Sequence, residues 1–298
     1  MLEVKNVCKS FGDVKALKDY SICVKKGEIL GLVGSNGSGK STSFRILLQL
    51  LKPDSGSITF EGKDLILCDK KDFGYLPEER TVFRDLSVRQ QLYFLGRLKG
   101  MSDSLIEERL LYWAKRLEIE QNLDKKIRSL SKGNQQKVQF LGCLLHSPKV
   151  MILDEPFSGL DPYNLELMKH IFLEYAKQGA YVLLSTHRLD HIESFCSNVV
   201  LLDKGEIRLQ GNIAQLRRQS DQRCITLMGD IPLHQIKDRL PYASVHKIGQ
   251  QIRIILPNEK EALLFCKWVM KQYDVLSLQI EYPSLAELFL EGKEYGML

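Results

Sequence analysis

The sequence predicts an α/β fold followed by a small α+β domain, and three observations indicate this architecture. A glycine-rich loop at residues 34–42 joins an apolar run to an apolar helical pattern. Two further apolar runs, at residues 150–153 and 181–184, have the composition of buried parallel strands. From about residue 224 the pattern becomes strand, helix, strand, strand, helix, strand, which is the order of the ferredoxin-like unit.

Composition limits the class of protein without defining it. A chain of 298 residues with 44% hydrophobic and 27% charged residues forms one large globular domain or two. The net charge of +5 neither requires nor excludes nucleic acid or an anionic membrane surface nearby. The seven cysteines include no Cys-x-x-Cys pair, so we expect reduced thiols in a cytosolic protein.

The N-terminal stretch predicts two short strands around a turn at residues 11–13, because apolar residues alternate on either side of it. Phe11 in this turn is either a loop aromatic that packs on the sheet or an aromatic that stacks on a purine base. The N-terminus does not resemble a signal peptide. No run approaches the roughly 18 apolar residues of a membrane span, so we expect any membrane role to depend on a partner.

The glycine-rich loop has the spacing of a phosphate-binding loop: a glycine, four residues, then Gly-Lys-Ser. Glycines let successive backbone N–H groups point inward, and the following helix N-terminus favours an anion. Lys40 is predicted to contact the β- and γ-phosphates, and Ser41 to ligate Mg²⁺. The predicted nucleotide site comprises Gly34, Ser35, Asn36, Gly37, Ser38, Gly39, Lys40, Ser41 and Thr42.

A helical insertion is predicted at about residues 84–147, with a capping box at Ser104 and Glu107. Near its end, small residues again open a helix, which predicts a second anion site at Ser131, Lys132, Gly133, Asn134 and Gln135. Two phosphate sites suit one nucleotide only if two copies pair head to tail and each completes the site of the other.

Candidate catalytic groups follow two apolar strands, where side chains collect at the carboxyl edge of an open sheet. Asp154 is placed to hold Mg²⁺, and Glu155 to polarise an attacking water. His187 follows the next apolar strand and is predicted to contact the γ-phosphate. A polar run at residues 217–222 marks the predicted boundary between a first domain at 1–218 and a second at 219–298.

Together these motifs resemble the ATP-binding domain of an ATP-binding-cassette (ABC) transporter, over residues 1 to about 215. The resemblance implies a phosphate-loop NTPase with a RecA-like core, a helical insertion and N-terminal antiparallel strands. It also implies adenine stacking by Phe11, a signature at residues 130–135 that departs at Lys132 and Asn134, and a dimer-contact loop containing Asp161.

A further position departs from the family: Glu78 stands where a glutamine is usual, and we expect it near Mg²⁺. The stretch Gly74–Arg80 and the C-terminal stretch Pro283–Leu290 are similar to a branch of drug, sodium and multidrug exporter ATPases. The resemblance implies ATP and Mg²⁺ as ligands, and a homodimer or paired ATPase subunit. It also implies separate membrane permease subunits, a peripheral location on the cytoplasmic face of the cell membrane, and no nucleic acid. The alternatives are a soluble ABC-type ATPase acting on ribosomes or nucleic acid, and an ATP-sensing regulatory subunit.

Overall fold

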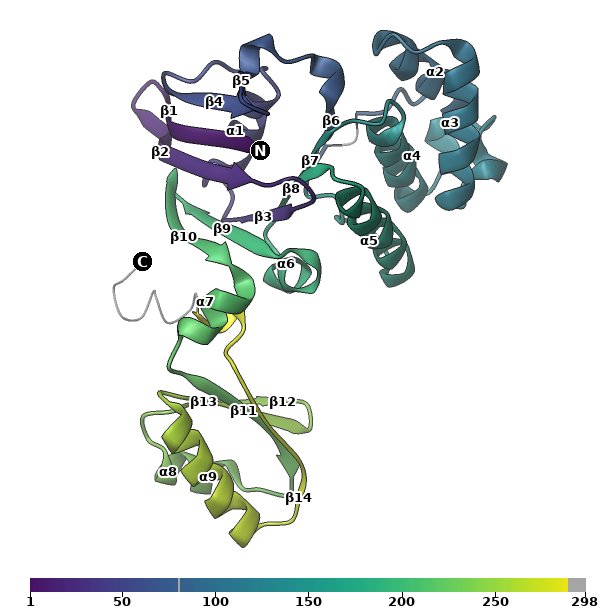
Figure 1. The fold of residues 1–298 in the computed structure, drawn as a ribbon. Coiled ribbons are helices and arrows are strands. Elements are labelled where there is room, and N and C mark those ends of the chain that lie inside the picture. The colour runs from purple at the N-terminus through teal and green to yellow at the C-terminus, as the bar shows by residue number, and fades with distance from the viewer. Residues whose placement is uncertain (80, 289–298) are drawn as a thin grey trace. The chain divides into compact units, whose positions relative to one another are not determined.

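The computed structural model describes residues 1–79 and 81–288. Its internal contacts divide the chain into two compact units, Met1–Gly211 and Asn212–Leu298 (Figure 1). The boundary predicted after residue 218 lies near the end of helix α7 (Ile213–Gln219). The second unit begins before this helix, at Asn212, and therefore includes it. Arg217 of α7 donates hydrogen bonds to the carbonyls of Tyr282 and Pro283, which explains that grouping.

A six-stranded sheet with the order β10-β9-β3-β8-β7-β6 forms the centre of the first unit (Figure 1). Every residue of β3, β7 and β8 is buried, as expected for parallel strands covered on both faces. The strands are β3 (Ile29–Val33), β6 (Phe73–Leu76), β7 (Val150–Asp154), β8 (Tyr181–Thr186), β9 (Asn198–Asp203) and β10 (Glu206–Asn212). Helices α1 (Lys40–Leu47), α5 (Pro162–Lys177) and α6 (Leu189–Phe195) connect them.

A second, antiparallel sheet with the order β2-β1-β4-β5 completes this core. Its strands are β1 (Leu2–Phe11), β2 (Val14–Val24), β4 (Ser55–Phe60) and β5 (Lys63–Asp64), followed by the short helices η1 (Leu65–Leu67) and η2 (Lys70–Asp72). Alternate residues of β1 and β2 point inward and join one hydrophobic cluster with α1 and the central sheet. The predicted N-terminal hairpin is therefore confirmed, and its tip pairs Phe11 with Val14.

The helical insertion contains α2 (Val88–Leu98), α3 (Asp103–Arg116) and α4 (Lys132–Leu144), with the short helices η3 (Glu120–Asn122) and η4 (Ile127–Ser129). The predicted capping box at Ser104 is wrong, because Ser102 caps α3 by accepting a hydrogen bond from the Leu105 N–H. Two glycines permit close helix contacts. A Cβ at Gly96 of α2 would lie 2.6 Å from Ile106 of α3, and one at Gly142 of α4 would lie 2.9 Å from Leu95.

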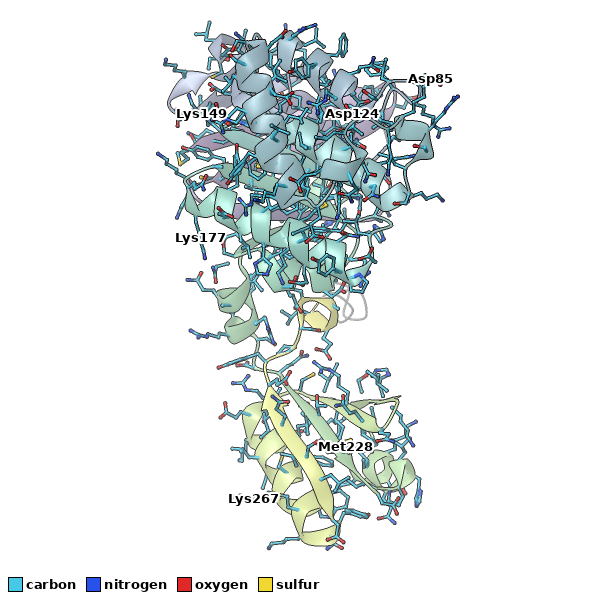
Figure 2. All side chains as sticks on the ribbon, turned by 90° about the vertical axis from the view of Figure 1, so that its right-hand side faces the viewer. Asp85, Asp124, Lys149, Lys177, Met228 and Lys267 are labelled. Atoms are coloured by element: carbon cyan, nitrogen blue, oxygen red, sulfur yellow. The ribbon has the colours of Figure 1, made fainter. Side chains whose placement is uncertain are left out.

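Exposed acidic side chains on this insertion neutralise nearby basic ones. Asp124, labelled in Figure 2, accepts a hydrogen bond from Arg89 at 2.9 Å, and Asp85 pairs with Arg128 at 3.2 Å. Arg128 belongs to a basic cluster at residues 125–128 whose charged side chains are exposed.

The second unit has the predicted ferredoxin-like order of elements. The strands β11 (Arg223–Gly229), β12 (Ser244–Ile248), β13 (Gln251–Leu256) and β14 (Val275–Glu281) pair antiparallel in the order β12-β13-β11-β14. Helices α8 (Leu233–Arg239) and α9 (Glu259–Gln272) pack on the sheet around their own hydrophobic cluster. The C-terminal stretch that resembles the exporter branch is helical over residues 285–288, and residues 289 and 290 lie outside the described part of the chain.

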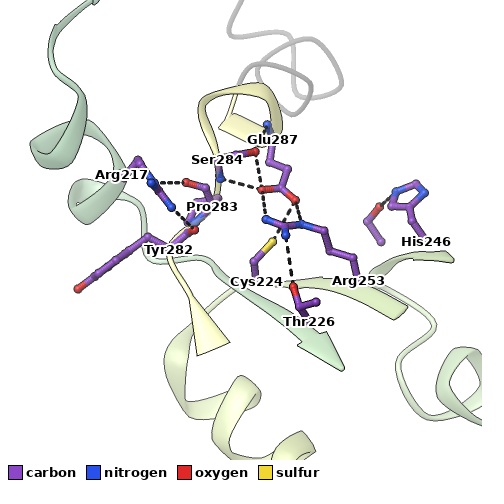
Figure 3. Close-up of polar contacts among 10 residues, drawn as sticks. Arg217, Cys224, Thr226, His246, Arg253, Tyr282, Pro283, Ser284 and Glu287 are labelled. Atoms are coloured by element: carbon purple, nitrogen blue, oxygen red, sulfur yellow. Dashed lines mark hydrogen bonds and ion pairs between the residues drawn. The ribbon is translucent and has the colours of Figure 1, made fainter. Parts of the chain in front are cut away.

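A polar cluster holds this C-terminal turn against the sheet (Figure 3). Glu287 accepts hydrogen bonds from the Arg253 guanidinium at 2.5 and 3.0 Å and from the Ser284 hydroxyl at 2.7 Å. The Cys224 thiol also donates to Glu287, at 3.1 Å. Burial opposes ionisation of Glu287, but the bonds from Arg253 and Ser284 outweigh it and lower the pKa of Glu287 to about 2.

Candidate nucleotide-binding site

The loop between β3 and α1 requires glycine at two positions. A Cβ at Gly34 would lie 2.3 Å from the carbonyl oxygen of Leu202. Gly39 has φ +112°, and a Cβ there would lie 2.5 Å from the carbonyl oxygen of Ala16. The loop is therefore packed against both β2 and β9, which holds its backbone in the curled path that directs N–H groups at a phosphate.

Lys40, the first residue of α1, folds back over this loop. Its ammonium donates to the carbonyl of Gly34 at 2.7 Å and to that of Ser35 at 3.0 Å. Burial lowers the pKa of Lys40, and the carboxylates of Glu155, Asp154 and Glu78 oppose this shift. The lysine is thus a pre-positioned cation that an incoming phosphate can engage.

A cavity of about 660 Å³ lies beside the loop and brings together residues far apart in the sequence. Of the predicted site residues it contains Asn36, Gly37, Gly39, Lys40, Ser41, Thr42, Glu78, Asp154 and Glu155. Residues that the sequence reasoning missed also line it: Asp13, Val14, Lys15, Ala16, Lys18 and Lys204. Lys15 and Lys204 add positive charge to a wall that also carries the carboxylates of Asp13, Glu78, Asp154 and Glu155.

Asp154 and Glu155 lie at the carboxyl end of β7, beside the loop. The Ser41 hydroxyl donates to one carboxylate oxygen of Asp154 at 3.1 Å, and the Ser185 hydroxyl of β8 donates to the other. The backbone N–H of Glu155 lies 3.2 Å from both the carbonyl and the hydroxyl oxygen of Ser185. Ser185 therefore fixes both acidic residues, and its part in the site was not predicted.

His187 and Phe11 lie outside the cavity lining formed by the described residues. His187 instead contacts Glu155, with 2.9 Å between Nδ1 and Oε1. Phe11 is half exposed at the tip of the N-terminal hairpin, with the Lys9 ammonium 5.6 Å from its ring centre. Val14 of the same hairpin lines the cavity, so the structure brings this aliphatic side chain closer to the loop than the aromatic one.

The predicted second anion site opens α4, where Ser131 and Lys132 are exposed and Gly133, Asn134 and Gln135 are partly buried. Ser131 caps the helix by accepting a hydrogen bond from the Asn134 N–H at 3.3 Å. A Cβ at Gly133 would meet nothing nearer than 4.0 Å, whereas the side chain of Gln135 is bonded to the carbonyls of Ile127 and Leu130. Asp161 caps α5, where its side chain accepts a hydrogen bond from the Asn164 N–H. In the described part of the chain none of Ser131, Lys132, Gly133, Asn134, Gln135 and Asp161 lines the cavity.

The β3–loop–α1 unit, with an acidic strand end beside it, defines the class of phosphate-loop NTPases. Residues 17–158 match the family described as ABC transporter. The chain belongs to the ATP-binding proteins of ABC transporters, a family that hydrolyses ATP. An uncharacterized ABC transporter ATP-binding protein of Bacillus subtilis strain 168, YhaQ, is 35% identical over 98% of this chain and 98% of its own.

Two solved structures extend this similarity. The cbiO1 protein of Clostridium perfringens, part of the ABC transporter complex cbiONQ, has a TM-score of 0.65 and 30% identity, over 80% of this chain and 95% of its own. The ATP-binding cassette MJ0796, in a dimeric post-hydrolysis state bound to ADP and Pi, has a TM-score of 0.63 and 25% identity, over 71% of this chain and 98% of its own. The predicted family and fold class are confirmed. No helix in the described ranges is long and apolar enough to cross a bilayer.

Proposed function

We propose that this ATP-binding subunit works as a pair, closes on ATP and drives export through separate membrane subunits. One observation carries the pairing: within residues 1–79 and 81–288, the cavity beside the phosphate loop contains no residue of the exposed α4 N-terminus. Ser131 and Gly133, which open α4, would then bind the nucleotide of a second subunit. The dimeric state of the related cassette MJ0796 supports this arrangement.

Within each site the proposed roles follow from the oxygen and nitrogen atoms present. Lys40 and the loop N–H groups bind the phosphates. The hydroxyl of Ser41 and the carboxylates of Asp154 and Glu78 are the hard oxygen ligands that suit Mg²⁺, which also keeps phosphate oxygens and water in its shell. The metal would supply positive charge to the phosphate oxygens. Glu155 orients the attacking water, and His187 contacts the γ-phosphate when the pair closes.

A groove on the first unit supports docking of a membrane subunit. A cavity of about 380 Å³ lies between α1, β6 and the helical insertion, and its lining includes Leu50, Pro77 and Leu98. Leu50 and Leu98 are 67% and 68% exposed. On the same helix as Leu98, Phe94 forms an exposed edge-to-face pair with Phe83, with 5.5 Å between the ring centres. Exposed apolar side chains of this density mark interaction surfaces.

The export direction and the peripheral location on the cytoplasmic face rest on the resemblance to exporter ATPases, and cbiO1 as part of cbiONQ supports the membrane partner. Mild detergent extraction followed by purification of this chain tests the partner. An integral membrane protein bound in stoichiometric amount is the expected result. A ribosomal or nucleic-acid partner, or a complex that shows no transport when reconstituted, would instead favour one of the alternative functions.

The pairing is tested with Gly133→Asp in a Glu155→Gln background, which is expected to accumulate the ATP-bound pair. The added carboxylate would face the partner's γ-phosphate, so the variant is expected to bind ATP but remain monomeric in size-exclusion chromatography. Gln121→Asp, which adds a carboxylate to an exposed turn of the same insertion, is the matched control and is expected to dimerise. Loss of ATP binding by the Gly133→Asp monomer would show that α4 acts within its own chain and that the pairing is wrong.

A further inference from the structure

One buried side chain reaches the nucleotide site only by bonding backbone carbonyls on either side of a site residue. Gln139 lies in the middle of α4 and is 6% exposed. Its Nε2 atom lies 3.1 Å from the carbonyl oxygen of Pro77 and 3.1 Å from that of Glu79. A side-chain amide has two N–H donors, so Gln139 holds both carbonyls at once. These carbonyls flank Glu78, the residue of this segment that lines the nucleotide cavity.

The other polar atom of Gln139 shows that this contact is not explained by packing alone. Its Oε1 atom is buried and has no hydrogen-bond partner among the described residues. An unpaired buried carbonyl destabilises a fold, and an apolar side chain of the same size would avoid that cost only by taking the donor away from the carbonyls of Pro77 and Glu79. Exceptions to the rule that buried polar atoms are hydrogen-bonded are expected at functional positions.

We propose that Gln139 is a positioning residue for ATP hydrolysis, which fixes the backbone on both sides of Glu78 and ties it to α4. The proposal deepens the role proposed above for Glu78 and rests on it. Helix α4 begins at the Ser131 cap, where the partner's nucleotide is proposed to bind. A displacement of α4 on closure is therefore transmitted to Glu78 by two hydrogen bonds, without a contact between Gln139 and the nucleotide.

Gln139→Met in the full-length chain tests this inference, because methionine keeps the length of the side chain and removes both donors. ATPase activity is measured at varied ATP and varied Mg²⁺. We expect kcat to fall at least about fivefold and the half-maximal Mg²⁺ concentration to shift about threefold, with KM for ATP within about twofold. Gln139→Leu repeats the test, and melting curves show which variants are folded. Folded variants with parental kcat and Mg²⁺ dependence would overturn the proposal.

The matched control is Gln91→Met. Gln91 is also buried and also bonds the connection between β6 and α2, but at a later residue. Its Oε1 accepts a hydrogen bond from the Phe83 N–H at 2.7 Å. This variant is expected to lower the melting temperature but to retain the Mg²⁺ dependence. An equal Mg²⁺ shift in Gln91→Met would mean that any loosening of the connection suffices and would refute a special role for Gln139.

A double-mutant cycle with Glu78→Ala separates this inference from the metal role of Glu78. If Gln139 acts through Glu78, Gln139→Met has a smaller effect on kcat in the Glu78→Ala background than in the parent. Effects that multiply independently would overturn the positioning role. The metal role fails on a different result, an unchanged Mg²⁺ curve for Glu78→Gln alone.

Discussion

The Nδ1 atom of His187 lies 2.9 Å from Oε1 of Glu155, although the side chain of His187 is 64% exposed and that of Glu155 only 10%. The contact joins the residues that follow two neighbouring strands, β7 and β8, at the same edge of the sheet. The proposed catalytic base is thus held by a side chain that remains accessible from outside. Closure of a second subunit over His187 would bury this pair and change the surroundings of Glu155.

The first prediction concerns catalysis by Glu155. Glu155→Gln keeps the size of the side chain and removes the carboxylate that orients water, so turnover is expected to fall at least about 10²-fold while ATP still binds. The measurement is steady-state ATPase activity beside equilibrium ATP binding. Glu108→Gln, a change of the same kind at an exposed position of α3, is a control for the loss of one charge. Near-normal activity of Glu155→Gln would reject Glu155 as the base.

The second prediction concerns the charge at Glu78. A carboxylate here can bind Mg²⁺ more strongly than a glutamine, but it adds negative charge near Asp154 and Glu155. Glu78→Gln is expected to preserve the fold and the affinity for ATP while changing the Mg²⁺ concentration needed for half-maximal activity. The curves are measured for parent and mutant side by side. Superimposable curves would eliminate the contact with the metal.

The third prediction concerns the boundary between the two units. A chain that ends at Gly211 keeps the complete hydrophobic cluster of the first unit, so we expect it to fold and bind ATP. A chain that ends at Ser220 keeps α7 but removes its bonds from Arg217 to Tyr282 and Pro283. We expect limited proteolysis to remove α7 from this longer chain. If the shorter chain is insoluble or does not bind ATP, the two units share one core.

The fourth prediction concerns pH and Glu287. Because its pKa is about 2 in the folded chain and about 4.5 when unfolded, the carboxylate stabilises the second unit above pH 4.5, and this stability is lost as pH falls toward 2. Glu287→Gln should cost on the order of 2 kcal/mol at neutral pH, and less as the pH falls below 4.5. Urea unfolding is followed by the fluorescence of Trp268 in a Trp113→Phe background.

The control for this prediction is Glu259→Gln. The side chain of Glu259 is 62% exposed in its pair with Arg223, and exposed pairs contribute little to stability. This variant should unfold like its parent at every pH. A Glu287→Gln penalty that persists unchanged at low pH would assign the loss to packing rather than to the carboxylate.

Local patterns in the sequence were sufficient for the phosphate loop and for the acidic end of β7, because each lies in one continuous stretch. Val14 and Lys204 were missed because they reach the cavity only through tertiary contacts. The turn at Lys204 is held against the loop by a hydrogen bond from the Gly205 N–H to the Ser38 carbonyl, at 2.9 Å. No local pattern encodes such a contact between residues far apart in the chain.

The wrong capping box has a different physical cause. Ser102 and Ser104 are both acceptable N-cap residues, and their hydroxyl oxygens lie 3.1 Å apart. The structure starts α3 at Asp103, and Ile106 then lies against Gly96 of α2, a tertiary contact that no local pattern encodes. Sequence pattern alone therefore located the helix but not its first residue.

The glycines at 96 and 142 determine how the helical insertion responds to force. They leave no room for a side chain between α2, α3 and α4, and a closely packed interior has low compressibility. We therefore expect the three helices to resist displacement relative to one another. If a second subunit displaces the N-terminus of α4 as proposed, Phe94 and Leu98 on α2 would move with it, so that pairing and the proposed docking surface would be linked by packing alone.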